Sequence, residues 1–319
     1  MLRGERQEMP DLSASCLIPS LNPKTVRAWR AFDPLGGERS ICRGRNQAMP
    51  QPEKPALNVP TPDETRLVTL DIDGPVATIV LNRPEKRNAL SLSVIERLRA
   101  CFAELPASVR VAIVAGAGPH FSAGLDLSEL SDADTADGLQ HSFAWYEVFS
   151  KIQFGRVPVI GVLQGAVVGG GLELASCLHV RIAEESAYFA LPEGQRGIFL
   201  GGGGSVRVSK LIGFSRVTEM MLTGHVVDAR EGHAIGLAHY VVPPGEGMRK
   251  ARELAERIAA NAPLSNFAIL NALPLIAEQP MSHGLMTEAL MATVTQSAPE
   301  AKERVNAFLN KRAAKVGPA

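Results

Sequence analysis

The most constraining part of the sequence is residues 157–193, VPVIGVLQGAVVGGGLELASCLHVRIAEESAYFALPE. Its apolar start, 157–163, predicts a buried strand that breaks at a Gln-Gly pair. Three glycines at 169–171 follow, and they open a short helical pattern with Glu173 in its first turn. A second carboxylate, Glu193, lies 20 residues further on, behind another strand-like segment. We interpret this stretch as an active site.

The segments before this stretch predict an α/β unit. RLVTLDID at 66–73 and VATIVL at 76–81 are separated by Gly-Pro, which is typical of a hairpin. Residues 91–105 carry one apolar stripe at helical spacing, and the continuous apolar run 109–116 predicts a strand buried on both faces. Strand, helix and strands recur at 157–163, 170–178 and 179–190. The sequence therefore predicts an α/β fold that winds a ββα unit repeatedly.

The second half of the chain has helical patterns, at 203–212, 215–223, 228–236, 247–261, 263–278, 284–295 and 298–313. Ser93 with Glu96, and Asp228 with Glu231, have the spacing of a capping box. The last three helices have apolar stripes wider than one core face needs, with examples at Leu285, Leu290, Met291, Phe308 and Leu309. Because a monomer rarely exposes such surface, we expect a subunit interface there.

Two loops have the composition of an anion site. In GPHFSAGLDLSEL, residues 118–130, small residues allow backbone N–H groups to approach a ligand. In QGAVVGGGLELA, residues 164–175, glycines bring N–H groups to the start of a helix. One N–H from each loop would make an oxyanion hole, in which each donor is worth roughly 3–4 kcal/mol of barrier. The alternative for a glycine cluster is a tight turn with close packing.

The two carboxylates each have a simpler explanation. Glu173 would be favoured in a first helical turn in any case, and Glu193 would be unremarkable in a solvated loop. However, the neighbours of Glu173 are apolar, and a buried carboxylate needs a partner or a chemical role. Two carboxylates beside an anion site suit addition or removal of water next to a carbonyl, because one can activate water while the other exchanges the α-proton.

Composition excludes several other classes. Equal numbers of basic and acidic residues, 33 each, give no global basic footprint for nucleic acid. The four cysteines are scattered and the histidines show no metal-binding spacing, so we expect free thiols, no metal and a cytoplasmic location. No apolar run reaches membrane-spanning length. No GxGxxG follows the first strand, so no dinucleotide cofactor is expected.

Residues 1–58 differ from the rest. They are rich in Pro, Arg, Gln and Glu without a sustained period, which predicts a disordered extension or a start codon assigned too early, with Met49 as the true first residue. A transit peptide is the alternative, but the segment contains acidic residues that such peptides lack.

Over roughly residues 64–315 the sequence resembles the crotonase (enoyl-CoA hydratase/isomerase) superfamily. The resemblance lies in NRPEKRNALS, HFSAGLDL, QGAVVGGGLELA and YFALPEGQRGIFLGGGGSVRVSKLIG, in that order, and in the ending FLNKRAAK. It implies a ββα spiral catalytic core, here 59–260, and a C-terminal helical region, 261–319, that builds homotrimers or homohexamers. It also implies acyl-CoA thioester substrates, with coenzyme A as part of the substrate and no separate cofactor.

The resemblance further implies roles for individual residues. The oxyanion donors would be the N–H groups of Ala123 and Gly170, and the acid/base pair would be Glu173 and Glu193. Which glutamate activates water stays open. The residues expected to contact coenzyme A or the acyl group are Lys86, Arg87, Ala89, Gly124, Leu125, Asp126 and Tyr146. For Lys86 and Arg87 the alternative is a solvated charged loop.

Tyr146 lies in an aromatic helical segment, 139–152, with Phe143 and Phe149 at steps of three. Such a stripe is typical of a core, but in crotonase relatives this region covers the acyl chain. We therefore expect it to shape acyl specificity.

The sequence departs from common hydratases after Glu193, where Phe199-Leu200-Gly201 replaces the usual Pro-Gly and a run of four glycines, 201–204, begins. This variant resembles the subgroup that includes methylthioacryloyl-CoA hydratase, which couples water addition to thioester hydrolysis. We expect an enoyl-CoA hydratase acting on a short 2-enoyl-CoA. The alternatives are that subgroup activity, a Δ3,Δ2-enoyl-CoA isomerase and, from another class, a non-catalytic binding protein of the same fold.

Overall fold

The computed structural model describes residues 66–129 and 134–310, and every structural statement below refers to these ranges. The predictions for residues 1–58 and for the last residues of FLNKRAAK fall outside them. Six strands form one sheet in the order β1-β2-β3-β4-β6-β9. Their bounds are Val68–Asp73 (β1), Val76–Leu81 (β2), Val111–Gly116 (β3), Val159–Leu163 (β4), Val180–Glu184 (β6) and Tyr240–Val242 (β9).

The pairing of these strands confirms the predicted hairpin and α/β unit. β1 and β2 are antiparallel, with Asp73 opposite Val76 across the Gly-Pro turn. The other pairs in the sheet are parallel. A second, three-stranded sheet has the order β5-β7-β8, and its strands are Ala166–Val168 (β5), Tyr188–Ala190 (β7) and Val226–Asp228 (β8).

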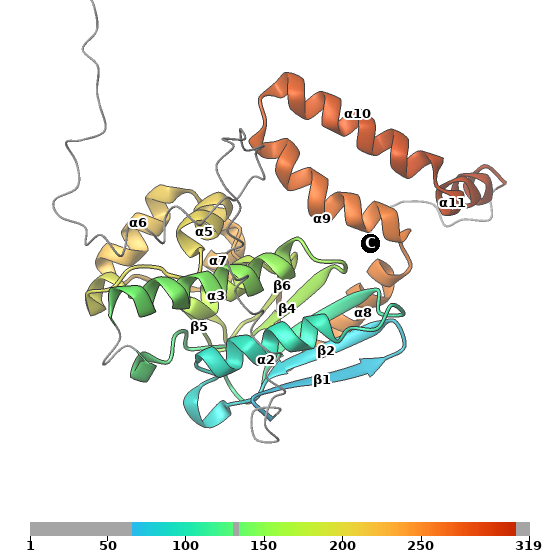
Figure 1. Ribbon diagram of the computed structural model, residues 1–319. Helices are drawn as coiled ribbons and strands as arrows, with labels where there is room; N and C mark the ends of the chain where they lie inside the picture. Colours follow the sequence, from blue (N-terminus) through green and yellow to red (C-terminus); the bar gives the residue numbers. More distant parts are fainter. Residues whose placement is uncertain (1–65, 130–133, 311–319) are drawn as a thin grey trace, which may run out of the picture. The chain divides into compact units, whose positions relative to one another are not determined.

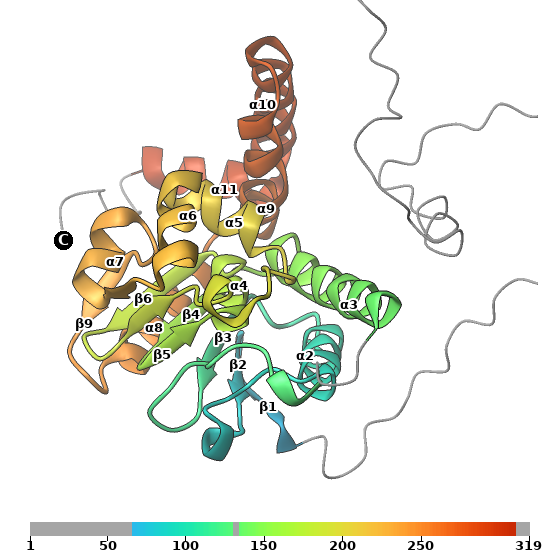
Figure 2. The same cartoon turned by 90° about the vertical axis from the view of Figure 1, so that its left-hand side faces the viewer.

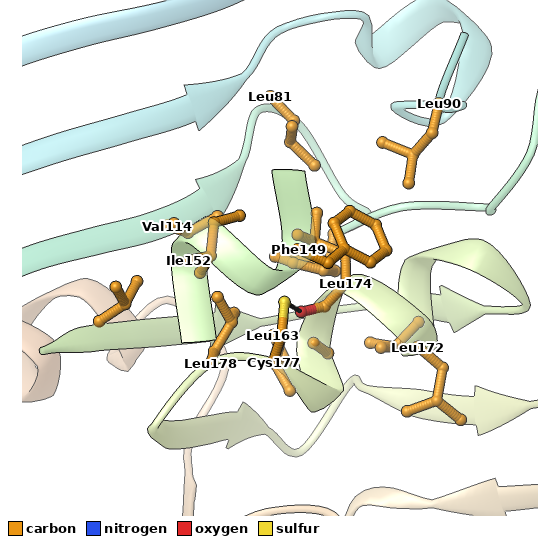
Figure 3. Close-up of a cluster of buried hydrophobic side chains, with 14 of the residues drawn as sticks. Leu81, Leu90, Val114, Phe149, Ile152, Leu163, Leu172, Leu174, Cys177 and Leu178 are labelled. Atoms are coloured by element: carbon orange, nitrogen blue, oxygen red, sulfur yellow. Dashed lines mark hydrogen bonds between the residues drawn. The ribbon is translucent and has the colours of Figure 1, made fainter. Parts of the chain in front are cut away.

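The large sheet separates two apolar cores, as expected for strands buried on both faces. Along β3, Ala112 and Val114 join one core, whereas Val111, Ile113 and Ala115 join the other. The first core lies against α2 (Leu92–Ala103), α3 (Thr135–Gln153) and α4 (Gly170–Ser176), and Figure 3 shows side chains of β2, β3, β4, α3 and α4 converging in it. The second lies against α8 (Gly247–Ala259), on the opposite face of the sheet (Figure 1).

The short helix α4 occupies a central position. All seven of its residues are buried, and it packs against β5 and α5 (Gly204–Ile212) (Figure 2). At its end, the buried Cys177 thiol donates to the Leu174 carbonyl, the dashed contact in Figure 3. Any polar side chain on α4 must therefore find its partners inside the protein.

The remaining helices confirm the helical second half. They are α6 (Phe214–Thr223), α7 (Ala229–Ile235), α9 (Pro263–Glu278), α10 (Met281–Ser297) and α11 (Pro299–Leu309), and single turns lie at Pro84–Lys86 (η2), Leu127–Glu129 (η3) and Gly194–Arg196 (η4). The predicted boundary at residue 260 falls between α8 and α9. In Figure 1, α9 and α10 lie side by side. None of the helices in the described ranges is long and apolar enough to cross a lipid bilayer.

The predicted cap of the first helix was wrong. Ser91, rather than Ser93, is the N-cap residue of α2, and its side chain accepts a hydrogen bond from the Val94 N–H. The Leu92 N–H is bound by the Glu129 carboxylate, 37 residues away in the chain. In α7 the Asp228 side chain does accept from the Glu231 N–H, as predicted.

Candidate active site

The two loops that were expected to supply N–H donors lie against each other. The Ser122 N–H donates to the Ala166 carbonyl (2.9 Å), and the Val168 N–H donates to the Ser122 carbonyl (3.1 Å). A Cβ at Gly124 would lie 2.5 Å from the Val168 carbonyl oxygen and 3.0 Å from the Gly170 nitrogen. Only a glycine fits there, at a φ of +90°. The main chain around residue 123 is thus brought beside the start of α4.

The two candidate donors differ in their present partners. Gly170 is the first residue of α4, and its N–H has no acceptor in the described part of the chain. The Ala123 N–H, in contrast, donates to the Arg87 carbonyl at 2.9 Å. That carbonyl must give way, or share the N–H, before Ala123 can hold a ligand oxygen. Arg87 has a φ of 52°, in the left-handed region that non-glycine residues rarely adopt.

The Glu173 carboxylate is buried and held by main-chain donors. Its Oε1 accepts from the N–H groups of Gly202 and Gly204, both at 2.8 Å. Burial raises the pKa of Glu173, while these N–H groups and the Arg207 guanidinium oppose the rise. A Cβ at Gly204 would lie 2.5 Å from Glu173 Cγ, so the glycine segment can approach the carboxylate this closely only without side chains.

The Glu193 carboxylate comes to the same place from the end of β7. A Cβ at Gly169, the residue before α4, would lie 2.7 Å from Glu193 Oε1. The side chain is buried, and Glu193 Oε2 has no hydrogen-bond partner. Burial, and then the neighbouring Glu173, raises the pKa of Glu193 to about 7. The predicted pair therefore meets at the start of α4, next to the Gly170 N–H.

Most of the residues expected to contact coenzyme A line one open groove. Five of the seven predicted positions line it, namely Lys86, Arg87, Ala89, Leu125 and Asp126, together with the predicted donor residue Ala123; Gly124 does not. Lys86 is half exposed and lies 3.7 Å from Asp126, which also pairs with Arg83 at 3.2 Å. The Ser128 hydroxyl, followed by Arg83, lowers the pKa of Asp126, which keeps this carboxylate charged.

The aromatic stripe divides in a way the sequence did not indicate. Phe149 is fully buried, but Phe143 and Tyr146 are exposed, and the buried face of α3 uses Trp145 instead. Tyr146 does not line the groove; its ring lies beside Gly203, where a Cβ would be 3.7 Å from Cδ1. Trp145 lies closer to the carboxylates, because a Cβ at Gly170 would be 2.7 Å from its ring.

Three features of the site were missed from the sequence. Arg196 lines the groove, the N–H groups of Gly202 and Gly204 bind Glu173, and Arg207 contacts that glycine segment. The run of four glycines was the available signal, but it was interpreted as part of the subgroup resemblance and as the start of a helix at 203–212, and not as a source of N–H donors to Glu173. Elsewhere, within residues 66–129 and 134–310, no three His, Cys, Asp or Glu side chains gather in a way that could hold a metal ion.

Over most of its length the chain is similar to a known protein family. The model of the enoyl-CoA hydratase/isomerase family matches residues 71–317. The chain belongs to this family. The crotonase resemblance is therefore confirmed, together with the α/β fold and its C-terminal helical region. The resemblance to the methylthioacryloyl-CoA hydratase subgroup stays a prediction.

Individual relatives cover the same part of the chain. The short-chain-enoyl-CoA hydratase of Clostridium acetobutylicum is 32% identical over 252 residues, which is 78% of this chain and 97% of the relative. The 2,3-dehydroadipyl-CoA hydratase of Escherichia coli is 32% identical, over 74% of this chain and 93% of the relative. A crystal structure of a Rhodopseudomonas palustris protein assigned to the enoyl-CoA hydratases is 55% identical, with a TM-score of 0.75, and covers 78% of this chain and 97% of that one.

Proposed function

We propose that the protein is an enoyl-CoA hydratase that adds water across the C2=C3 double bond of a short-chain 2-enoyl-CoA thioester. The observation that carries this proposal is the pair of buried carboxylates, Glu173 and Glu193, beside the Gly170 N–H. Relatives named as hydratases of enoyl-CoA and dehydroadipyl-CoA support it. A family member with one carboxylate could exchange protons but would lack the second group that hydration uses.

In the proposed reaction, the N–H groups of Gly170 and Ala123 hold the thioester oxygen, once the Arg87 carbonyl has given way. One glutamate takes a proton from water as the water oxygen bonds to C3, and the enolate charge develops on the held oxygen. The other glutamate delivers a proton to C2. The hydroxyl of water thus ends on C3, and the proton of the second glutamate ends on C2. The proton taken from water stays on the first glutamate and returns to the second, directly or through solvent, before the next turnover. No cofactor is needed beyond the coenzyme A of the substrate.

The acidity of the pair suits this exchange. A group transfers protons best when its pKa is close to the working pH. Burial raises the pKa of Glu193 to about 7, so its protonated and ionised forms are both populated near neutrality. We propose that Lys86 and Arg87 bind phosphates of coenzyme A at the open groove, and that the aromatic face of α3 bounds the acyl group.

Replacing Glu173 with Gln tests the two-carboxylate assignment. The variant keeps the size of the side chain but cannot take or give the proton, so we expect hydration of crotonyl-CoA to fall by about 10²–10⁴-fold. Loss of the conjugated enoyl absorbance measures the rate. Glu185→Gln, at an exposed glutamate that pairs with Arg230, is the matched control and should keep the wild-type rate.

A full hydratase rate in Glu173→Gln would show that the assignment is wrong. The isomerase alternative predicts a different result, because Glu193 alone could shuttle the proton of a 3-enoyl-CoA. Isomerase activity that survives in Glu173→Gln, with no hydration by the wild type, would replace the proposal.

The acyl substituent needs its own experiment. The sequence after Glu193 resembles the subgroup that acts on a sulfur-substituted substrate, so crotonyl-CoA and methylthioacryloyl-CoA are compared while absorbance and free thiol are followed. Loss of absorbance without thiol release supports plain hydration. Thiol release with the sulfur substrate alone supports the subgroup activity. No change with either substrate contradicts both.

A further inference from the structure

Arg207, in the first turn of α5, contacts the glycine segment that binds Glu173. Its guanidinium donates to three uncharged acceptors: Nε to Gln153 Oε1 (2.7 Å), Nη1 to the Gly202 carbonyl (3.1 Å) and Nη2 to Ser150 Oγ (3.2 Å). Over the described ranges it forms no salt bridge with an acidic side chain. The part-buried guanidinium thus joins α3 to the main chain of Gly202 instead of forming an ion pair.

This arrangement holds Gly202 from two sides. The Gly202 N–H donates to Glu173 Oε1, and the Gly202 carbonyl accepts from Arg207. The Gly204 N–H donates to the same carboxylate oxygen. The position of the Glu173 carboxylate therefore depends on the position of the main chain between these two glycines.

That main chain cannot be ordered by side chains of its own. A Cβ at Gly202 would lie 2.7 Å from the Trp145 ring, and a Cβ at Gly204 would lie 2.5 Å from Glu173 Cγ. Gly203 has a φ of +90°, which also requires glycine. Because three consecutive glycines are intrinsically flexible, the rigidity must come from a neighbouring group, and Arg207 supplies it from outside the segment.

We propose that Arg207 is a positioning residue for hydration, which anchors the Gly202 main chain to α3 and thereby holds the Glu173 carboxylate in its reactive place. The inference rests on the role proposed for Glu173. Arg207 also acts through its charge, since the guanidinium opposes the rise that burial causes in the pKa of Glu173. The other titratable groups that interact electrostatically with this carboxylate are Glu193 and the Cys177 thiol.

Arg207→Gln tests the proposal. A small displacement of a reacting group costs up to about 10²-fold in rate, so we expect kcat for crotonyl-CoA to fall by roughly 10- to 100-fold while KM changes little. Loss of the cation should also move the titration of Glu173 to higher pH, because an adjacent positive charge favours the ionised form. The limb of the kcat–pH profile that belongs to Glu173 should move with it. Carbon-13 NMR of glutamate side chains, assigned with Glu173→Gln, reports that titration without any turnover.

Two further variants separate positioning from charge and from folding. Arg207→Lys keeps the positive charge but loses the planar guanidinium that donates to three acceptors at once. We therefore expect kcat to fall while the Glu173 titration stays close to that of the wild type. Lys210→Gln removes a cation one turn further along α5, where Lys210 pairs with Glu278, and should leave kcat and the titration unchanged. If Arg207→Gln does not fold, Gln153→Ala removes one anchor of the guanidinium and should lower kcat in the same way.

The outcomes are distinct. A lower melting temperature with unchanged kcat and unchanged Glu173 titration would mean that Arg207 is only structural, and would overturn the proposal. An equal loss in Lys210→Gln would also overturn it, as would wild-type kcat in Gln153→Ala when that variant is used. If the wild type fails to hydrate crotonyl-CoA, the proposed function falls, while the NMR titration still decides whether Arg207 sets the state of Glu173.

Discussion

Glu173 and Glu193 are both buried, but the fold satisfies them differently. Glu173 Oε1 receives two main-chain hydrogen bonds, whereas Glu193 Oε2 is buried without a partner. A buried group without compensation disfavours its charged form, which explains why the pKa of Glu193 rises to about 7. Near neutral pH the protein therefore carries an acid whose ionisation opposes folding.

We expect Glu193→Gln to stabilise the protein at pH 8 while it impairs hydration. The pKa of this carboxyl is about 7 in the folded protein and 4.5 in the unfolded chain. Between pH 4.5 and pH 7 the unfolded chain therefore binds fewer protons than the folded protein. Wild-type stability consequently falls as the pH rises through that window. The full effect is on the order of 3 kcal/mol. Urea unfolding at pH 4 and pH 8 measures it.

The gain from Glu193→Gln should be small at pH 4, grow up to about pH 7 and then stay level. Glu185→Gln, at an exposed glutamate, provides the control and should show no such dependence. A variant that is equally stable or less stable than the wild type at pH 8 would contradict a buried, uncompensated Glu193.

Sequence reasoning located both glutamates because each sits in a local context that carries a signal, one after glycines and one after a strand. It could not find Arg207. The importance of Arg207 depends on Gln153 and Ser150, which lie more than 50 positions away and approach it only when α3 packs beside α5. Likewise, the contact between the Arg87 carbonyl and the Ala123 N–H has no pattern in the sequence.

At the level of elements, the strands with continuous apolar runs and most helices were predictable, since each buries a whole face. The strands β5, β8 and β9 were not, because three residues are too few to show a period of two. The cap of α2 was misplaced for a similar reason. Ser91 and Ser93 are equivalent by type, and the second partner of the helix start, Glu129, comes from another loop.

The two serines make a direct comparison possible. Ser91→Ala removes the side chain that accepts from Val94 N–H, so we expect a loss of about 1 kcal/mol in the free energy of unfolding. Ser93→Ala, in the exposed first turn of the same helix, should change it by less than about 0.5 kcal/mol. Denaturant titration of both variants measures the difference. Equal changes in the free energy of unfolding for the two variants would show that the Ser91 side chain does not stabilise the helix as its cap.

At the level of the whole molecule, α9, α10 and α11 leave many apolar side chains exposed. They include Phe267, Ile269, Leu273, Leu275, Met281, Leu285, Met286, Leu290, Val305, Phe308 and Leu309. Monomeric soluble proteins rarely expose large contiguous apolar patches. The expectation of a subunit interface on these helices came from the same stripes in the sequence, and it stays a prediction.

We expect the purified protein to form a homotrimer or homohexamer, with a mass three or six times 34.0 kDa. Leu285→Asp combined with Leu290→Asp should dissociate it, because charges would then be buried in an apolar contact. Sedimentation or light scattering measures the mass, and Ser282→Asp on the same helix is the control. A wild type that is monomeric at all concentrations would exclude this use of the surface.

Both N–H groups that we propose to hold the thioester oxygen belong to the main chain, at Ala123 and at Gly170. Any substitution at 123 or 170 except proline leaves the main-chain N–H in place, so alanine scanning cannot remove either donor. If α3 bounds the acyl group as we propose, exchanging its residues would change the choice of substrate while the loops that meet at Gly124 keep both donors in place.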